Sequence, residues 1–291
     1  MSSAGVTLAL ARLGMSEMIC IGAERSYPPQ LPLTWWWTIL RRWTYGSLDS
    51  VVALTEAAKE WLVDYTQAKH VSVIPNSVVW PLASQPPRLT PSKFVSMETR
   101  MLLAVGRLSE EKRFDRLIRV FQALADQHKN WVLCIIGDGF MLGRLQALVV
   151  ECGLVGRVHL PGRVGNVDEW YCAADLYVLC SRFEGFPNSL LEAMACGVPP
   201  VSFDCLTGPR DIITDGVDGR LVANGNFDAL KECLSELMAD QTLRTQYGGR
   251  AVEVRDRFSI ETIAASWETL ISDLARTPGD DYSGRAPSHE A

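Results

Sequence analysis

Residues 176–204 read LYVLCSRFEGFPNSLLEAMACGVPPVSFD and predict the fold of the chain around them. An apolar run at 176–181 is followed by a turn-like Glu-Gly-Phe-Pro segment, a helical run at 189–196 and a second apolar run at 199–204. Strands that are apolar throughout and separated by helices are typical of a parallel sheet that is covered on both faces. The stretch therefore predicts a strand–helix–strand unit of an α/β domain.

The same alternation runs from residue 101 to residue 274. Further strands are expected at 101–106, 131–139, 158–162 and 219–222. Helices are expected at 112–128, 141–152, 166–173, 209–214, 226–239, 242–256 and 259–274, the first of them with apolar residues at clear helical spacing.

The N-terminal part has its own, smaller set of elements. Strands are expected at 16–22, 50–55 and 71–75, and helices at 3–13, 33–47 and 56–68. Three strands make about half of a doubly wound sheet and leave an open edge. The proline-rich stretch 80–93 reads as a linker. The expected division is a partial N-terminal domain at 1–92, a second domain at 93–258, a closing helix at 259–274 and a disordered tail at 275–291.

Composition excludes several classes of protein. A net charge of −6 argues against sequence-independent binding of nucleic acid. The eight cysteines form no CxxC pair and the four histidines are scattered, which favours reduced thiols in a cytosolic protein over a disulfide framework or a zinc site. No apolar run approaches the ~18 residues of a membrane span, and the N-terminus has no Lys or Arg before its apolar core, so it reads as a helix rather than a signal peptide.

Glu184 and Glu192 raise the question of whether they work as a pair. Ser189 and Glu192 have the Ser-x-x-Glu spacing of a capping box, with Gly197 placed to end the helix. From the motif alone that structural explanation is favoured for Glu192, but it leaves Glu184 unexplained. A helix that follows a parallel strand begins at the carboxyl edge of the sheet, where its free N–H groups suit a phosphate.

Arg107 and Lys112 lie in VGRLSEEKRFD (105–115), just after a strand that ends in Gly106. Both cations can reach the same sheet edge as the 189–196 helix, and paired cations suit a diphosphate. The structural alternative is a surface ion pair of Arg107 with Glu110 or Glu111. The Arg-x4-Lys spacing directly after the strand favours the functional interpretation.

Two further segments are ambiguous. GDGFMLG (137–143) resembles a loosened dinucleotide fingerprint, but the acidic residue that would hold a ribose is missing after it, so a tight packing turn is favoured over NAD binding. In LPLTWWWTILRRWTYG (31–46), Trp35, Trp36 and Trp37 cannot share one helix face. With Arg41 and Arg42 they could meet a membrane surface, and packing between domains is about equally favoured.

With these segments placed, the chain resembles the family 4 retaining glycosyltransferases from about residue 17 to residue 274. The resemblance is carried by VGRLSEEKRFD (105–115), IIGDG (135–139), LPGRV (160–164), SRFEGFPNSLLEAMACGVPPVSFD (181–204) and GPRDIITDGVDGRLV (208–222). ERSYPP (24–29) and RRWTYGSLDSVVALT (41–55) also resemble bacterial enzymes that build surface polysaccharides and lipid-linked glycans.

The resemblance implies a GT-B fold, with two Rossmann-like domains, parallel sheets and the donor nucleotide held mainly by the C-terminal domain. It implies that Arg107 and Lys112 hold the donor diphosphate, that Glu184 faces the donor sugar, and that Glu192 binds the ribose hydroxyls. Arg107, Lys112 and Glu184 are the implied catalytic residues. The implied substrate-binding residues are Gly106, Gly162, Arg163, Val164, Gly185, Phe186, Asn188, Ser189, Leu190 and Glu192, with Gly162–Val164 against the base. Such enzymes generally need no metal or other cofactor.

The function implied is transfer of a hexose or N-acetylhexosamine, with retention, from a nucleotide sugar to a saccharide or lipid-linked acceptor. UDP is the favoured nucleotide, and the expected place is the cytoplasm, peripherally at the inner face of the membrane. The family's N-terminal glycine-rich loop and early histidine are absent, since the first histidine is His70. The N-terminal domain is therefore expected to be truncated, which leaves a non-catalytic nucleotide-sugar-binding remnant as one alternative and a sugar-nucleotide epimerase as a weaker one.

Overall fold

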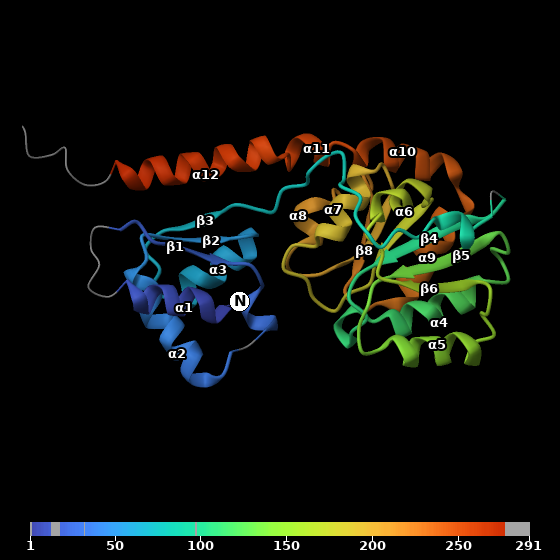
Figure 1. Ribbon diagram of the computed structural model, residues 1–291, viewed down its shortest axis with the longest axis horizontal. Helices are drawn as coiled ribbons and strands as arrows, with labels where there is room; N and C mark the ends of the chain where they lie inside the picture. The colour runs from blue at the N-terminus through green and yellow to red at the C-terminus, as the bar shows by residue number, and fades with distance from the viewer. Residues whose placement is uncertain (1, 13–17, 32, 97, 277–291) are drawn as a thin grey trace, which may run out of the picture. The chain divides into compact units, whose positions relative to one another are not determined.

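The computed structural model describes residues 2–12, 18–31, 33–96 and 98–276. The chain divides into two compact units, one holding the residues up to Pro75 together with those from Glu261 on, the other Asn76–Ile260. Each unit has its own sheet, and all the strand pairs described are parallel. The predicted α/β fold with two parallel sheets is therefore confirmed (Figure 1). The expected tail from 277 on, residue 13 of the helix expected at 3–13 and residues 16–17 of the strand expected at 16–22 lie outside the described residues.

The first unit is built on the sheet β1-β2-β3, whose strands are Ile21–Glu24, Ser50–Ala53 and Val71–Val73. Its helices are α1 (Ser2–Ala11), α2 (Trp35–Thr44), α3 (Glu56–Tyr65) and α12 (Ile260–Ala275), with short 3₁₀ turns η1 (Pro28–Gln30) and η2 (Tyr45–Ser47). Successive side chains of a strand point to opposite faces. Val51 and Ala53 accordingly join the core formed with α1 and α3, while Val52 packs with Ile74 and Ile263 of α12. The middle strand is therefore covered on both faces.

Helix α2 places the tryptophan segment partly on the surface and partly in the core. Trp35 and Trp43 are 76% and 61% exposed, whereas Trp37 packs against the core of the unit. Arg41 is buried: it pairs with Glu24 at 3.8 Å and lies 4.6 Å from the ring centroid of Trp61. The expectation that Trp37 and Arg41 face a membrane is therefore wrong, because the helix turns them toward the sheet.

The second unit is built on a six-stranded sheet with the order β6-β5-β4-β7-β8-β9. Its strands are β4 (Arg100–Val105), β5 (Trp131–Ile136), β6 (Val158–Gly162), β7 (Leu176–Leu179), β8 (Pro200–Asp204) and β9 (Arg220–Ala223). From β4 the chain first adds β5 and β6 on one side, and it then adds β7, β8 and β9 on the other side. This reversal between β4 and β7 is the topological switch point of a Rossmann-like sheet.

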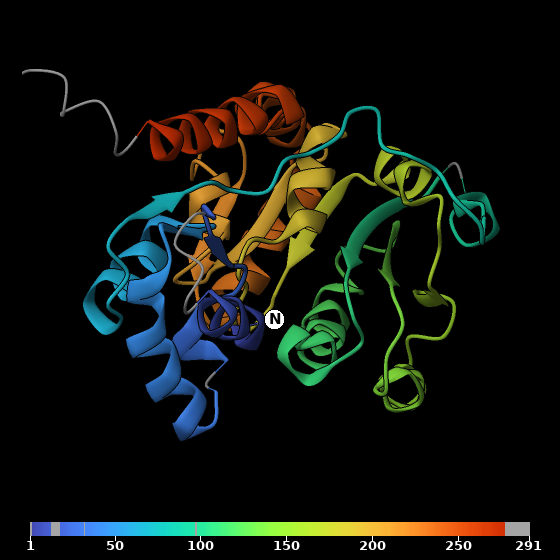
Figure 2. The same ribbon diagram turned by 60° about the vertical axis from the view of Figure 1, so that its left-hand side comes forward.

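Helices cover both faces of this sheet. On one face α4 (Phe114–Leu124), α5 (Leu142–Glu151) and α9 (Phe227–Ala239) share a single apolar core with alternate strand residues such as Leu102 and Ala104. On the other face lie α6 (Val167–Ala173) and α7 (Asn188–Ala195), as Figures 1 and 2 both show. The remaining elements of this unit are η3 (Pro91–Lys93), η4 (Glu110–Lys112), α8 (Pro209–Ile212), α10 (Gln241–Ala251) and α11 (Val254–Arg257).

The proline-rich stretch 80–93 is part of the second unit rather than a link between two domains. Its backbone exchanges hydrogen bonds with Gly165: the Gln85 N–H donates to the Gly165 carbonyl at 2.8 Å, and the Gly165 N–H to the Pro87 carbonyl at 2.7 Å. A Cβ on Gly165 would lie 2.1 Å from the Gln85 carbonyl oxygen, so only glycine permits this approach. The division between the units thus falls after Pro75, and not at 92/93 as the prolines suggested.

The glycines of GDGFMLG pack against the turn that follows β4. Gly137 has φ +147°, and a Cβ there would lie 1.8 Å from the carbonyl oxygen of Gly106. Gly139 has φ +159°, and its Cβ would lie 2.4 Å from the carbonyl oxygen of Leu108. The packing interpretation of this segment accounts for both glycines, because the turns after β4 and β5 touch backbone to backbone.

We predict that Gly137→Ala destabilises the chain by at least about 3 kcal/mol, because the overlap adds to the strain of a positive φ. The matched control is Gly143→Ala in α5, where a Cβ meets nothing within 4 Å. This change should stabilise the chain by up to about 1 kcal/mol, since alanine is the better helix former. Urea unfolding measures both, and equal stability of Gly137→Ala and the parent would contradict the packing account.

Candidate functional site

The strongest candidate site lies at the carboxyl ends of β4 and β7, where the strand order reverses. Gly106 and Arg107 follow β4, and the loop of residues 180–187 follows β7. Ligands of open α/β sheets bind in the crevice at this point, because the connections on either side run to opposite faces of the sheet. The sequence-predicted residues after both strands are therefore brought to one place.

An ion pair joins the two segments. The Nζ atom of Lys112, in η4, lies 2.5 Å from Oε1 of Glu184, in the loop after β7. Their side chains are only 17% and 12% exposed, so this pair is shielded more than the surface ion pairs of the chain. Removing either partner would leave a shielded charge uncompensated, which is costly. The prediction that Lys112 and Glu184 lie at the same sheet edge is met by this geometry.

Arg107 is exposed, and within the described ranges it makes no ion pair. The described residues show no direct ion pair of Arg107 with Glu110 or Glu111, but, against the effect of burial, the Ser109 hydroxyl and the charge of Arg107 both lower the pKa of the Glu111 carboxyl. The Glu111 carboxylate instead accepts a hydrogen bond from the Ser109 hydroxyl at 2.6 Å. The Arg107 guanidinium is thus available to a ligand at this edge of the sheet.

Hydrogen bonds with three other segments of the chain fix the loop after β7. The Arg182 N–H donates to the Glu111 carbonyl at 2.7 Å, and the Asn224 side chain donates to the Arg182 carbonyl at 2.9 Å. The Thr207 hydroxyl donates to the Glu184 carbonyl at 2.5 Å. These bonds fix the loop backbone, so Glu184 is presented from a rigid support.

Free backbone donors follow Glu184. Among the described residues, the N–H groups of Gly185, Phe186, Asn188 and Ser189 donate to no protein acceptor. Helix α7 begins at Asn188, so two of these groups are the unsatisfied donors of a helix N-terminus. Together with Arg107 and Lys112 they form a surface suited to an anion.

The capping box expected at Ser189 and Glu192 is absent. Helix α7 has Pro187 at its N-cap position and no side-chain cap. Ser189 therefore lies inside the first turn, where its hydroxyl accepts a hydrogen bond from the buried Tyr177 hydroxyl at 2.9 Å. The Glu192 carboxylate accepts one from the Tyr171 hydroxyl at 3.1 Å. The helix starts one residue earlier than predicted, so neither side chain is used as a cap.

Burial raises the pKa of the Glu192 carboxyl, and the hydrogen bond from Tyr171 opposes that rise. Among the residues that the structure describes, none forms an ion pair with Glu192, and its carboxylate accepts its hydrogen bond from the Tyr171 hydroxyl. A carboxylate kept there at a cost to stability is consistent with a binding role rather than a structural one.

A cavity of about 270 Å³ lies against Glu192. Its walls come from α6, α7 and the segment after Pro75, namely Ser77, Val78, Val79, Leu82, Ala83, Val167, Asn188, Leu191 and Glu192. The Asn76 side chain donates to that of Asn188 at 2.8 Å and ties this segment to α7. The sequence prediction missed the lining residues 77–83, because nothing in this segment shows which helix it will cross.

The other predicted residues differ in what they can offer. Gly162 ends β6 with φ +85°, Arg163 is exposed and Val164 is buried, and none of the three lines the cavity beside Glu192. The side chains of Phe186 and Leu190 are buried in the protein. Only the backbone of these two residues can therefore face a ligand.

Thiol chemistry does not fit this site. Cys180 and Cys205 flank the loop that carries Glu184, and burial raises the pKa of each thiol to about 12. Both thiols are therefore protonated near neutral pH and are poor nucleophiles. Among the residues that the structure describes, no three His, Cys, Asp or Glu side chains are grouped as a metal site requires, and no helix is long and apolar enough to cross a membrane.

Comparison with known proteins gives the family and shows that the fold is that of the GT-B glycosyltransferases. Residues 89–254 match the family model described as "Glycosyl transferases group 1". Because the match covers more than half of the chain, the protein belongs to the group 1 glycosyltransferases.

Two curated relatives illustrate the similarity. The chain is 34% identical over 282 residues to an exopolysaccharide phosphotransferase of Streptomyces coelicolor, covering 96% of this chain and 29% of that protein. It is 28% identical over 233 residues to the amylovoran biosynthesis glycosyltransferase AmsD of Erwinia amylovora, covering 80% of this chain and 65% of the relative. The chain thus spans only part of these relatives, and its homologues act in bacterial polysaccharide biosynthesis.

Among solved structures, HepE of Anabaena in complex with UDP superposes with a TM-score of 0.81 at 19% identity. The superposition covers 94% of this chain and 77% of HepE. At that identity the likeness establishes the GT-B fold.

We predict that Glu192→Gln stabilises the chain at neutral pH. The folded-state pKa of Glu192 lies above its unfolded value, so its contribution to stability is present at low pH and is lost as the pH rises through the folded pKa. Glutamine keeps an acceptor for Tyr171 and does not titrate. The variant should melt a few degrees above the parent at pH 7 and at the same temperature near pH 3.5, since 1 kcal/mol is about 2–4 °C for a unit of this size.

Thermal melts from pH 3.5 to pH 8 measure this difference. Glu236→Gln is the matched control, because Glu236 is an exposed carboxylate paired with Arg220 at 3.3 Å. A Glu192→Gln variant that melts below the parent at every pH would contradict the conclusion that the ionised Glu192 carboxylate destabilises the fold.

Proposed function

We propose that the chain is the donor-binding and catalytic part of a retaining glycosyltransferase that uses a UDP-linked hexose or N-acetylhexosamine. The acceptor is a saccharide or a lipid-linked saccharide. The observation that carries the proposal is the shielded Lys112–Glu184 pair, with the exposed Arg107 at the same sheet edge, at the strand-order reversal of the second unit.

Each residue has a role that its chemistry supports. The diphosphate lies against Arg107, Lys112 and the free N–H groups of 185–189, which stabilise the negative charge that develops on the departing nucleotide. Glu184 faces the donor sugar and accepts hydrogen bonds from its hydroxyls while it orients Lys112. Glu192 accepts hydrogen bonds from the ribose hydroxyls at the 270 Å³ cavity. The backbone of Gly162–Val164 lies against the base.

Two considerations support UDP and a metal-independent reaction. HepE, which shares the fold, was solved with UDP and with UDP-glucose, and TarM of Staphylococcus aureus was solved with UDP. Two protein cations and a helix N-terminus supply the positive charge for which other enzymes use Mg²⁺. The donor nucleotide therefore needs no bridging metal in this proposal.

A second candidate function is binding of a nucleotide sugar without transfer. It is favoured by the three-stranded sheet described in the first unit, which is half the size of the sheet in the second. Release of UDP from a UDP-sugar in the presence of a saccharide or lipid-linked acceptor would exclude this alternative.

We also propose that α2 lies at the surface of a membrane that carries the acceptor. Trp35, Trp36, Ile39 and Trp43 are exposed, and their spacing places them on one face of the helix. Arg42 is exposed next to Trp43. Tryptophans with a neighbouring cation are typical of helices that lie in the interface of an anionic membrane.

Binding to vesicles of anionic and neutral lipid tests this surface. We expect Trp35→Ser/Trp43→Ser to lose at least about tenfold in affinity for anionic vesicles, because two exposed apolar side chains no longer leave water. Phe140→Ser is the matched control, since Phe140 is 78% exposed but lies in the second unit. Equal binding of the double variant and the parent would exclude α2 as the contact.

Calorimetric titration with UDP, GDP, ADP and uridine tests the donor site. The parent should bind UDP selectively, and Arg107→Ala should lose about tenfold or more in UDP affinity while keeping its affinity for uridine, because only UDP carries the diphosphate. Arg119→Ala removes the same charge from the surface of α4 and is the control. Absence of nucleotide binding by the parent would overturn the proposal, and equal losses for UDP and uridine would remove Arg107 from the diphosphate.

A further inference from the structure

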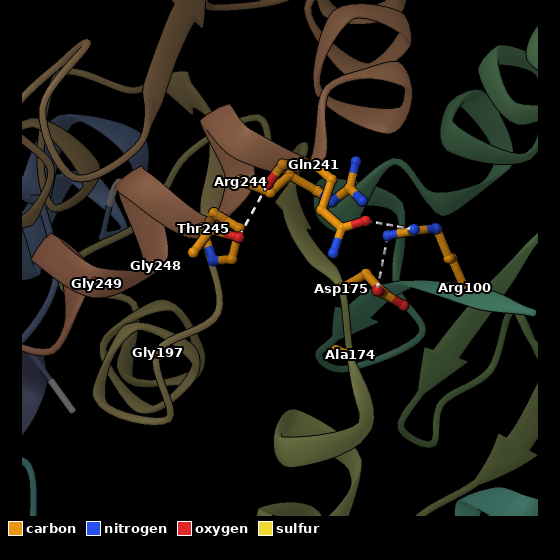
Figure 3. A pocket seen from close by; sticks show the side chains of 10 residues that line it. Arg100, Ala174, Asp175, Gly197, Gln241, Arg244, Thr245, Gly248 and Gly249 are labelled. Carbon is orange, nitrogen blue, oxygen red and sulfur yellow. Dashed lines mark hydrogen bonds and ion pairs between the residues drawn. The ribbon is translucent and has the colours of Figure 1, made fainter. Parts of the chain in front are cut away.

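A cavity of about 460 Å³ opens at the other edge of the second sheet (Figure 3). Arg100 begins β4, and Asp175 and Pro199 immediately precede β7 and β8. Because all these strands are parallel, their amino ends lie opposite the edge that carries Gly106 and Glu184. The cavity is lined by Arg100, Ala174, Asp175, Gly197, Pro199, Gln241, Arg244, Thr245, Gly248 and Gly249. It is therefore separate from the candidate donor site.

Arg244 is a buried cation in the wall of this cavity. It is 5% exposed, and its Nη1 donates to the carbonyls of Leu237 and Met238 at 2.5 and 3.1 Å, where α9 ends. Its guanidinium also lies 5.1 Å from the ring centroid of Trp131. These contacts hold the guanidinium in one place, unlike an arginine on an open surface.

A second guanidinium faces the same space. Arg100 lies 3.5 Å from Asp175, and its Nη2 donates to the Gln241 side chain at 2.8 Å. Burial lowers the pKa of Arg244, and the charge of Arg100 lowers it further. Of the residues that line the cavity, Asp175 is the one carboxylate, and it also accepts the Met101 N–H at 2.8 Å. The charges of Asp175 and Asp240 both favour the charged form of Arg244, and of these two carboxylates Asp175 lines the cavity. The lining itself therefore carries two cations and one carboxylate.

Gly249 keeps the space open. It lies in the interior of α10, where glycine is less stable than alanine, and a Cβ there would meet nothing within 4 Å. Packing therefore does not explain this glycine. The adjacent Gly248 is different, because a Cβ there would lie 2.4 Å from the Gly197 carbonyl oxygen.

We propose that this cavity binds a small phosphate monoester that carries free hydroxyl groups. The guanidiniums of Arg100 and Arg244 match the oxygens of a phosphate in a planar, charge-assisted geometry. Asp175 and the Thr245 hydroxyl supply acceptors for ligand hydroxyls on the same wall. The cavity is larger than a phosphate alone requires, so the ligand is a phosphorylated polyol or sugar rather than the free ion.

The first test is calorimetric titration of the 291-residue chain with glycerol 3-phosphate, inorganic phosphate and glycerol at constant ionic strength. Glycerol 3-phosphate should bind more tightly than inorganic phosphate, and glycerol should not bind. Absence of binding by glycerol 3-phosphate would overturn the proposal. Equal affinity for glycerol 3-phosphate and inorganic phosphate would overturn the assignment of the hydroxyl contacts.

Two variants locate the site. Arg100→Gln should lose about tenfold or more in affinity for glycerol 3-phosphate, because one charge-assisted contact is removed. Arg220→Gln is the matched control: the side chain of Arg220 is 32% exposed and lies 3.5 Å from Asp215, against 31% and 3.5 Å from Asp175 for Arg100. Equal losses in the two variants would mean that binding follows net charge alone and would overturn the site.

Gly249→Gln is the second variant, since it fills the cavity without changing the charge. It should keep or raise the melting temperature, because glutamine is the better helix former, and it should abolish binding of glycerol 3-phosphate. Parent-like binding by a folded Gly249→Gln variant would show that the ligand lies elsewhere.

Discussion

The strand order of the second unit reverses between β4 and β7, and the candidate site depends on that reversal. The turn after β4 carries Gly106 and Arg107, while the loop after β7 carries Glu184. Since the connections leave these neighbouring strands toward opposite faces, the two carboxyl ends border an open crevice. The Lys112–Glu184 pair spans this crevice at 2.5 Å and links the two segments chemically.

The candidate site is rigid because backbone contacts support it from behind. Gly137 and Gly139 let the turn after β5 touch the turn after β4, where any Cβ would overlap a carbonyl oxygen. Hydrogen bonds from Thr207 and Asn224 hold the loop that carries Glu184. The buried hydroxyls of Tyr171 and Tyr177 donate hydrogen bonds to the side chains of Glu192 and Ser189 in α7. Preorganised groups of this kind can meet developing charge without rearranging.

The two edges of the same sheet offer different chemistry. At the carboxyl edge the cations stand beside free N–H groups of α7, and they suit the diphosphate of a nucleotide. At the amino edge Arg100 and Arg244 face an open cavity with a carboxylate and a hydroxyl on its wall. Helix α7 begins at the first edge, and Gly197, just beyond its end, lines the cavity at the second. One compact unit thus combines the candidate donor site with a second polar cavity.

The sequence by itself determined the alternation of strands and helices, the parallel sheets and the glycosyltransferase resemblance, because apolar periodicity and local motifs such as Glu-Gly-Phe-Pro are written within a few neighbouring residues. It also placed Lys112 and Glu184 at one sheet edge. Only the tertiary structure decided features that join distant residues. In the folded protein Glu192 accepts a hydrogen bond from Tyr171 and forms no capping box. Arg41 is buried and pairs with Glu24. Residues 77–93 belong to the second unit. These contacts depend on which helix and strand faces pack together after folding, and the periodicity of the sequence does not predict that.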